Sequence, residues 1–184
     1  MLLETALDEH DAGFEAALES ALENSLARDA VIAKNASERE ALWRLRHSIS
    51  EAQKHEGASL KHDVSVPVVA MDRFIEVATA AVMAACPSAR VIAFGHVGDG
   101  NVHFNVSQPP GEPPERFLAQ RERIAAVVYD VVDRFDGSFS AEHGVGVLKK
   151  KALRDYRGGV ELDLMRRLKN TLDPDGIMNP GKVL

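Results

Sequence analysis

Residues 90–107 read RVIAFGHVGDGNVHFNVS and predict a β-hairpin. Two strand-like runs flank Asp99-Gly100, and an Asp-Gly pair between such runs is the strongest short-range signal of a hairpin. With Asp99 and Gly100 as the two central residues of the turn, His96 faces His103 across the two strands. The rest of the fold is predicted outward from this hairpin.

The segments around the hairpin alternate between strand-like and helical patterns. The predicted order is strand, helix, strand, strand, helix, strand, at 59–66, 70–85, 90–97, 101–107, 115–134 and 137–142. This is the order of the split βαβ, ferredoxin-like unit. The predicted fold class is therefore α+β, with a mainly antiparallel sheet and helices on one face.

The two ends of the chain are predicted to be mostly helical. Helical spacing predicts helices at 2–26, at 37–55 and, as a pair, between 147 and 172, with a strand-like run at 30–34. Ser37 and Glu40 form a Ser-x-x-Glu capping box at the start of the second helix. We interpret the helix and strand at 2–34 as the remnant of an earlier unit.

Composition restricts the class of protein. The 184 residues suit one domain, or one domain built from two similar subdomains. A net charge of −6 disfavours a nucleic-acid or anionic-membrane partner. No apolar run approaches the roughly 20 residues of a membrane span, and the start, Met-Leu-Leu-Glu, has no basic segment typical of a secretory signal. The single cysteine, Cys86, suits a reducing compartment, so we expect a cytoplasmic protein with a buried, inert thiol.

The hairpin also carries two candidate metal ligands. If His96 and His103 are directly opposed, their Cβ atoms lie about 4.5–5.5 Å apart and both imidazoles can reach one metal ion. Asn105, two residues beyond His103, points to the same side. The alternative is a hairpin whose histidines are merely half-buried or solvated.

A candidate third ligand follows the last predicted strand. Glu142 lies in the segment from Ser140 to Gly146 and could complete a site of two histidines and one carboxylate. Because Glu142 and His143 are adjacent, a regular strand would direct them to opposite faces. Both can serve one site only if the strand already bends at Gly144. The alternative is a polar strand end beside a flexible turn.

Cationic side chains suggest a site for a carboxylate. Arg46 and Ser50 are four residues apart, hence on one face of the helix at 37–55, and Lys61 lies on the following strand. An arginine can bind a carboxylate with two parallel hydrogen bonds, and a lysine adds a point charge. The alternative is that Arg46 is one of several solvated charges.

Five segments together resemble the C-terminal domain of the FAD-linked oxidase family, which includes D-lactate dehydrogenases, D-2-hydroxyglutarate dehydrogenases and the flavin subunit of glycolate oxidase. They are Trp43 to Arg46, Lys61 to Pro67, Gly95 to Asn105, Glu142 to Gly146, and Asp173-Pro174 with Asn179 to Lys182. They follow the family's order over nearly all of residues 1–184.

The resemblance implies a role for each candidate residue. His96, His103 and Glu142 would bind a divalent metal, zinc or manganese. Arg46 and Lys61 would bind the substrate carboxylate, with Ser50 nearby. Asn105 would orient the substrate, His143 would be the general base, and Asn179 would lie near FAD. The implied reaction is oxidation of a D-2-hydroxyacid to a 2-oxoacid, with hydride transfer to FAD.

The family's N-terminal FAD-binding domain has no counterpart in this chain. We therefore expect the FAD-binding domain as a partner, a chain that is inactive in isolation, and an unidentified electron acceptor. Apolar surface that the missing domain would cover favours a homodimer of the isolated chain. The alternative function is a non-catalytic ferredoxin-like module that binds a small carboxylate or a partner domain.

Overall fold

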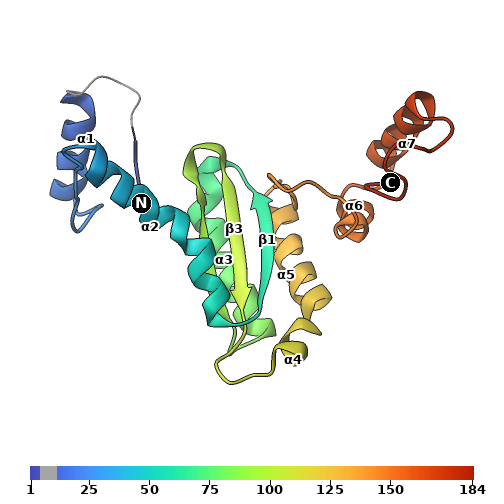
Figure 1. Cartoon of the computed structure of the whole chain (residues 1–184), viewed down its shortest axis with the longest axis horizontal. Coiled ribbons are helices and arrows are strands. Elements are labelled where there is room, and N and C mark those ends of the chain that lie inside the picture. Colours follow the sequence, from blue (N-terminus) through green and yellow to red (C-terminus); the bar gives the residue numbers. More distant parts are fainter. Residues whose placement is uncertain (5–11) are drawn as a thin grey trace. The chain divides into compact units, whose positions relative to one another are not determined.

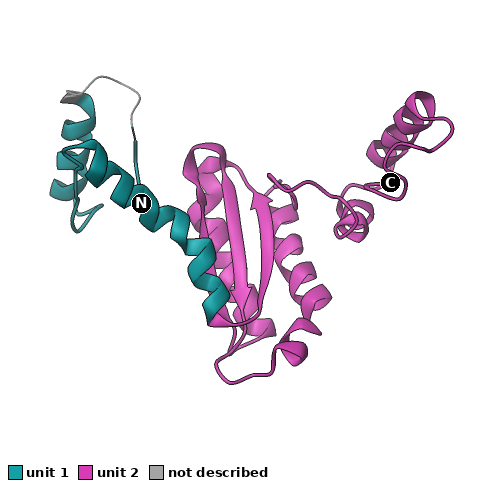
Figure 2. Cartoon of the chain, in the orientation of Figure 1, with its two compact units in different colours: residues 1–55 teal, residues 56–184 magenta. Residues whose placement is uncertain are grey.

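The computed structural model describes residues 1–4 and 12–184, so part of the predicted helix at 2–26 lies outside the described residues. The chain divides into two compact units, residues 1–55 and 56–184, which Figure 2 colours separately. The predicted hairpin belongs entirely to the second of these units, so the fold of unit 2 positions its two histidines.

Unit 1 contains two helices, α1 (Ala12–Glu23) and α2 (Ala36–Ala52), and a 3-10 helix, Gln53–Glu56, follows α2 across the boundary. The strand expected at 30–34 is wrong: this segment is irregular, because no strand pairs with it among the described residues. The capping box is two residues earlier than expected. Asn35 accepts a hydrogen bond from the Glu38 N–H at 3.0 Å, and Glu38 accepts one from the Lys34 N–H at 2.8 Å.

Unit 2 is built around a three-stranded antiparallel sheet, which confirms the α+β fold class (Figure 1). Its elements are β1 (Ser59–Ser65), α3 (Met71–Ala85), β2 (Arg90–His96), β3 (Asn101–Ser107), α4 (Pro114–Leu118), α5 (Arg121–Arg134), α6 (Lys150–Tyr156) and α7 (Val160–Leu172). The strand order is β1-β3-β2. The helix expected at 115–134 is two helices, α4 and α5.

The strand expected at 137–142 is wrong in extent. Only one antiparallel bridge, between Ser65 and Ser138, joins this segment to the free edge of β1. Beyond it, the backbone N–H groups of residues 141–143 turn to the side chain of Asp63. The Ala141 N–H also reaches the Asp63 carbonyl oxygen, at 3.2 Å. Because the Asp63 side chain competes with the strand ladder for these donors, no further bridge follows in the described residues. The fourth strand of the ferredoxin-like unit is thus reduced to a contact at its expected edge.

One face of the sheet forms the hydrophobic core with α3 and α5. The fully or almost fully buried side chains are Val64, Val102, Phe104 and Val106 from the sheet, Phe74, Ala78 and Val82 from α3, and Ile124, Val128, Val131 and Val132 from α5. The Phe74 and Phe104 rings meet edge to face with centroids 5.9 Å apart. Cys86 is buried beside this core, as expected.

A buried histidine on the core face makes stability depend on pH. The Nδ1 atom of His62 lies 3.0 Å from the Phe104 carbonyl oxygen, to which it donates as the neutral tautomer, and burial lowers the pKa of His62 to about 4. The unfolded chain, with an ordinary histidine pKa of 6.5, binds a proton that the folded chain rejects. The folded state therefore loses stability as pH falls below 6.5, and the loss is complete near pH 4.

We expect His62→Gln to remove this component, because glutamine keeps a donor for the Phe104 carbonyl but does not titrate. Between pH 7 and 4 the free energy of unfolding should fall by about 3 kcal/mol more in the wild type than in the variant. Urea unfolding followed by circular dichroism at several pH values measures the difference. Parallel pH curves for the two proteins would contradict a neutral buried His62.

Candidate metal and substrate site

The hairpin register differs from the expected one by two residues. His96 pairs with Asn101, and Phe94 pairs with His103. The turn comprises residues 97–100, with a 3-10 helix at Val97–Asp99 and Gly100 in the left-handed region at φ 74°. Direct opposition of His96 and His103 is therefore wrong, because Asp99 and Gly100 end a four-residue turn instead of forming the centre of a two-residue turn.

The two imidazoles nevertheless share one face of the sheet. Side chains alternate between faces with a period of two, so a shift of two residues leaves His96 and His103 on the same side. Their ring centroids lie 6.0 Å apart. The expectation of a common face is confirmed, with His96 and His103 as diagonal neighbours.

This face is polar and opposite the core. Three neighbouring rows run across it, composed of Ser65, Asn101 and His96, of Asp63, His103 and Phe94, and of Lys61, Asn105 and Ile92. Asn105 is buried and lies two residues beyond His103 on the same side, as expected. Lys61 is exposed and directly opposite Asn105.

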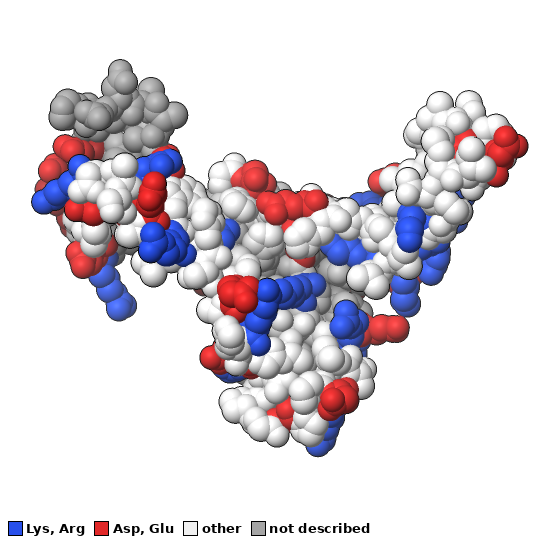
Figure 3. All heavy atoms as spheres, in the orientation of Figure 1, with Lys and Arg blue, Asp and Glu red and all other residues white. Residues whose placement is uncertain are grey.

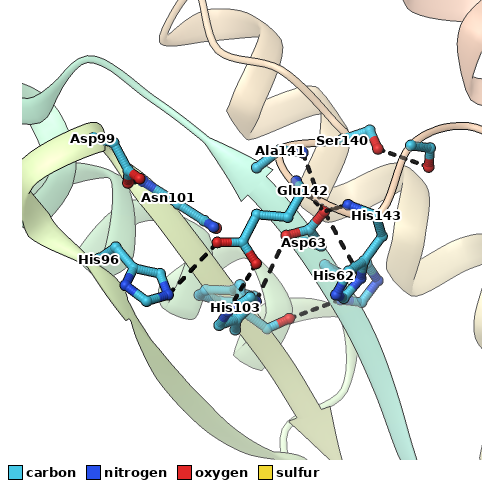
Figure 4. A network of polar contacts seen from close by, with 12 residues as sticks. His62, Asp63, His96, Asp99, Asn101, His103, Ser140, Ala141, Glu142 and His143 are labelled. Atoms are coloured by element: carbon cyan, nitrogen blue, oxygen red, sulfur yellow. Dashed lines mark hydrogen bonds and ion pairs between the residues drawn. The ribbon is translucent and has the colours of Figure 1, made fainter.

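Glu142 approaches both histidines from the segment that follows α5 (Figure 4). Its Oε1 atom lies 3.5 Å from Nε2 of His96, and its Oε2 atom lies 3.8 Å from Nε2 of His103. The side chain of His103 is 16% exposed, whereas those of His96 and Glu142 are about half exposed, at 50% and 47%. Three donor groups thus converge at an open surface.

The bend that allows Glu142 and His143 to serve one site begins before Gly144. Asp63 accepts the backbone N–H groups of Glu142 and His143 at 2.8 Å each, and that of Ala141 at 3.2 Å. The His143 ring lies almost parallel to that of His103, with centroids 5.9 Å apart and planes at 18°. The adjacent residues therefore face the same site because the backbone has left strand geometry.

Sequence reasoning missed Asp63 and Lys149. The available signal for Asp63 was its position two residues from Lys61, on the same face of a predicted strand. The Nζ atom of Lys149 lies 3.0 Å from Ser140 Oγ, 3.1 Å from the Phe139 carbonyl oxygen and 3.9 Å from Asp63 Oδ2. A half-buried lysine and a buried aspartate thus lie beside the site.

Burial shifts the pKa values of Asp63 and His103 in one direction, and neighbouring hydrogen-bond donors and charges shift them in the other. Burial raises the pKa of Asp63, but the N–H groups of His143 and Glu142 and nearby positive charges outweigh it, so that the net pKa is lowered. Burial lowers the pKa of His103, and the charges of Glu142 and Asp63 only partly offset the effect. Asp63 is therefore a carboxylate and His103 a neutral imidazole near pH 7, and a neutral imidazole is the form that binds metals.

In the described part of the chain, the side chains that come close enough together to hold a metal ion are Asp63, His103, Glu142 and His143. One donor atom of each lies within 4.8 Å of the others. His96 is outside this group but lies beside Glu142, at 3.5 Å. Imidazole nitrogens and carboxylate oxygens are donors that zinc and manganese accept, so the residues present fit a divalent ion.

The remaining predicted residues lie apart in the chain. Arg46 and Ser50 lie on α2 in unit 1, with Arg46 half-buried and Ser50 exposed. Asn179 lies in the turn that follows α7 and has a positive φ of 47°. Arg46 and Ser50 thus belong to unit 1, whereas Asn179 and the histidine cluster belong to unit 2.

The described part of unit 2 is an α+β unit whose polar sheet face groups imidazole and carboxylate side chains that could hold a metal ion. Residues 1–183 match the family of FAD linked oxidases, C-terminal domain. The chain belongs to this family.

Curated relatives carry enzyme names. A D-2-hydroxyglutarate dehydrogenase of Xanthomonas citri pv. viticola is 39% identical over 173 residues, which are 94% of this chain and 36% of that protein. One from Stutzerimonas stutzeri is 35% identical over 168 residues, 91% of this chain and 36% of that protein. A putative mitochondrial D-lactate dehydrogenase of Schizosaccharomyces pombe is 35% identical over an aligned length of 185 residues, gaps included, which covers 95% of this chain and 34% of that protein. The chain thus spans about a third of each relative.

Two surface properties of the described residues bear on possible membrane contacts and on charge. No helix there has the length and apolar character needed to cross a bilayer. Within each unit, acidic and basic side chains are interspersed on the face drawn in Figure 3.

Proposed function

We propose that this chain is the substrate- and metal-binding part of a flavin-dependent D-2-hydroxyacid dehydrogenase, which oxidises a 2-hydroxyacid to a 2-oxoacid. The observation that supports it most is the approach of Glu142 to the Nε2 atoms of both His96 and His103 in a chain of the FAD-linked oxidase family. The relatives' names include both D-2-hydroxyglutarate and D-lactate dehydrogenases, so the proposal extends to the 2-hydroxyacid class.

His96, His103 and Glu142 are the proposed metal ligands. Zinc or manganese bound there would supply a Lewis acid that lowers the pKa of a substrate hydroxyl, and FAD, bound mainly by a domain outside this chain, would supply the oxidant for the C2 hydrogen. The half-exposed side chains of His96 and Glu142 leave the ligand cluster accessible to a small substrate.

Substrate binding is proposed for Arg46, Ser50, Lys61 and Asn105. Lys61 and Asn105 are directly opposed on the polar face, in the row next to Asp63 and His103. The lysine ammonium group can bind a carboxylate, and the asparagine amide can donate to or accept from a hydroxyl group. Arg46 and Ser50 are proposed to add a guanidinium and a hydroxyl to the same carboxylate.

His143 is the proposed general base. Its Nδ1 atom lies 3.8 Å from Asp63 Oδ2, which leaves Nε2 to accept the proton of the 2-hydroxyl. The Asp63 carboxylate would then stabilise the imidazolium that forms. Asn179 is proposed to lie near FAD, and the electron acceptor remains to be identified.

A homodimer of the isolated chain and a cytoplasmic location are also proposed. The dimer is supported by exposed large apolar side chains on α7, including Val160, Leu164 and Leu168. The cytoplasmic location is supported by a single, buried cysteine, although several relatives are named as mitochondrial proteins.

Metal binding by the purified 184-residue chain tests the proposal. After removal of metal with a chelator, titration with Zn²⁺ or Mn²⁺ in a calorimeter should give one ion per chain. His103→Ala and Glu142→Gln should each weaken binding by more than about 100-fold, exceeding the 10–100-fold typical when a ligand loses its hydrogen-bond partner.

His55→Ala is the matched control, because His55 is an exposed histidine outside the ligand cluster. It should leave the affinity unchanged. If the wild type binds neither metal, or if His103→Ala binds as tightly as the wild type, the chain is better described as a metal-independent binding module.

A further inference from the structure

Asp63 has a role that the proposed ligands and base do not cover. It lies in the middle of β1, only 2% of its surface is exposed, and its Oδ2 atom accepts three consecutive backbone N–H groups, those of residues 141–143. Consecutive N–H groups that converge in this way form a concave site for an anion. The charge of Asp63 is thus used to hold the backbone that carries Glu142 and His143.

The second carboxylate oxygen of Asp63, Oδ1, lies beside the ring of His103. Oδ1 is buried and has no hydrogen bond among the described residues, and Nδ1 of His103 lies 3.6 Å from it. On the other side of the ring, Nε2 of His103 faces Glu142 at 3.8 Å. A carboxylate thus lies beside each ring nitrogen, but that of Asp63 is nearer and only 3% exposed, whereas that of Glu142 is 47% exposed and screened by water. The proton is therefore favoured on Nδ1, which leaves Nε2 free as a ligand.

The ammonium group of Lys149 partly neutralises the buried negative charge of Asp63. Its Nζ atom lies 3.9 Å from Asp63 Oδ2, and the lysine side chain is 15% exposed. It also donates to the backbone carbonyl oxygens of Phe139 and Asp63, at 3.1 and 3.4 Å. A buried carboxylate that is paired and hydrogen-bonded in this way remains charged, whereas an unpaired one would not.

We propose that Asp63 is the positioning residue of the site: one oxygen fixes the Glu142-His143 backbone, and the other holds His103 with its proton on Nδ1, so that Nε2 faces Glu142 without a proton. This deepens the proposed function and rests on it only where metal affinity is concerned. The positions of the His103 ring and of the Glu142-His143 backbone can be measured in the chain without any metal.

The substitution Asp63→Asn distinguishes the roles of the two carboxylate oxygens, because it keeps an acceptor at one position and places a donor at the other. The three backbone N–H groups require an acceptor, so the amide oxygen of the new side chain stays with them and its NH₂ group occupies the place of Oδ1. That group can only donate, so His103 Nδ1 must become an acceptor and the proton moves to Nε2. In the metal-free chain at pH 8, the ¹⁵N chemical shifts of the His103 ring should show a proton on Nδ1 in the wild type and on Nε2 in the variant.

Metal affinity and backbone protection give two further readouts. Asp63→Asn should weaken Zn²⁺ binding by about 10–100-fold, as expected when a ligand loses its orienting partner. Asp63→Ala removes the acceptor as well, so amide hydrogen exchange at Glu142 and His143 should become at least about 10-fold faster than in the wild type.

Asp173→Asn is the matched control. Asp173 is also buried, accepts the backbone N–H groups of Ile177 and Met178 at 2.9 and 3.0 Å, and is paired with Lys169. It is not part of the histidine cluster, so its substitution should leave the His103 ring shifts and the exchange of residues 142 and 143 as in the wild type.

Each outcome is decisive for one of the two proposals. An unchanged His103 tautomer in Asp63→Asn overturns the positioning role, even if the wild type binds metal. A changed tautomer in a chain that binds no metal supports the positioning role and contradicts the proposed function. If the variant does not fold, the wild type alone decides, because a proton on Nε2 of His103 in the metal-free wild type overturns the inference.

Discussion

Gly100→Ala is expected to destabilise unit 2 by more than about 2 kcal/mol and to disturb the histidine cluster at the same time. Gly100 has a φ of 74°, which an L-residue adopts only with strain, and a Cβ atom there would overlap the carbonyl oxygen of Val66. The overlap is with backbone, so no side-chain rotation relieves it. The turn must move, and with it the backbone hydrogen bond from Val66 N–H to the Gly100 carbonyl oxygen, which is 3.0 Å long.

Gly98→Ala in the same turn provides the control. Nothing lies within 4 Å of a Cβ atom built on Gly98, and its φ is not in the left-handed region. Its free energy of unfolding should change by less than about 0.5 kcal/mol. Urea unfolding measures both variants, and Zn²⁺ titration should show weaker binding only for Gly100→Ala. Equal stability of the two variants would show that the turn tolerates a side chain at position 100.

Phe104→Ala is expected to have the largest effect on stability. The Phe104 side chain is fully buried at the centre of β3, against Phe74 of α3. Its removal leaves a cavity that the rigid sheet cannot close, and such substitutions lower the free energy of unfolding by about 3–5 kcal/mol. Small domains are stable by only about 5–15 kcal/mol, so a large part of the stability of unit 2 should be lost.

Chemical denaturation followed by far-ultraviolet circular dichroism tests this expectation. Val69→Ala is the comparison, because Val69 is 92% exposed and its truncation should change stability by less than about 0.5 kcal/mol. A loss of less than about 1 kcal/mol in Phe104→Ala would mean that the core repacks around the missing ring, and would contradict a tightly packed contact between the sheet and α3.

The fold was predictable where the sequence carries a local period. The strands expected at 59–66 and 101–107 match β1 and β3 to within one residue, because alternating side chains and flanking turn residues are local signals. The segment at 30–34 has a similar composition but no neighbouring strand in the described part of unit 1. A strand depends on its partner, and a single sequence does not show which segments pair.

The candidate site was likewise predictable only where it depends on local sequence patterns. The common face of His96 and His103 follows from parity alone, which survives a shift of two residues. The true register depends on the 3-10 helix at Val97–Asp99, which lengthens the turn to four residues and which the Asp-Gly pair does not specify. The role of Asp63 depends on hydrogen bonds to a segment 79 residues further along the chain, and no local pattern contains them.

That sequence separation also determines the order in which the site forms during folding. His96 and His103 belong to one hairpin, whose short turn closes with little loss of chain entropy. Glu142 joins them only after α5 has packed and the chain has returned to the edge of β1 at Ser138. Because closing a short loop costs less chain entropy than closing a long one, we expect the two imidazoles to come together before Glu142 reaches them. We therefore expect the long-range contact of Asp63 with residues 141–143 to form late and to complete the site after the three strands have paired.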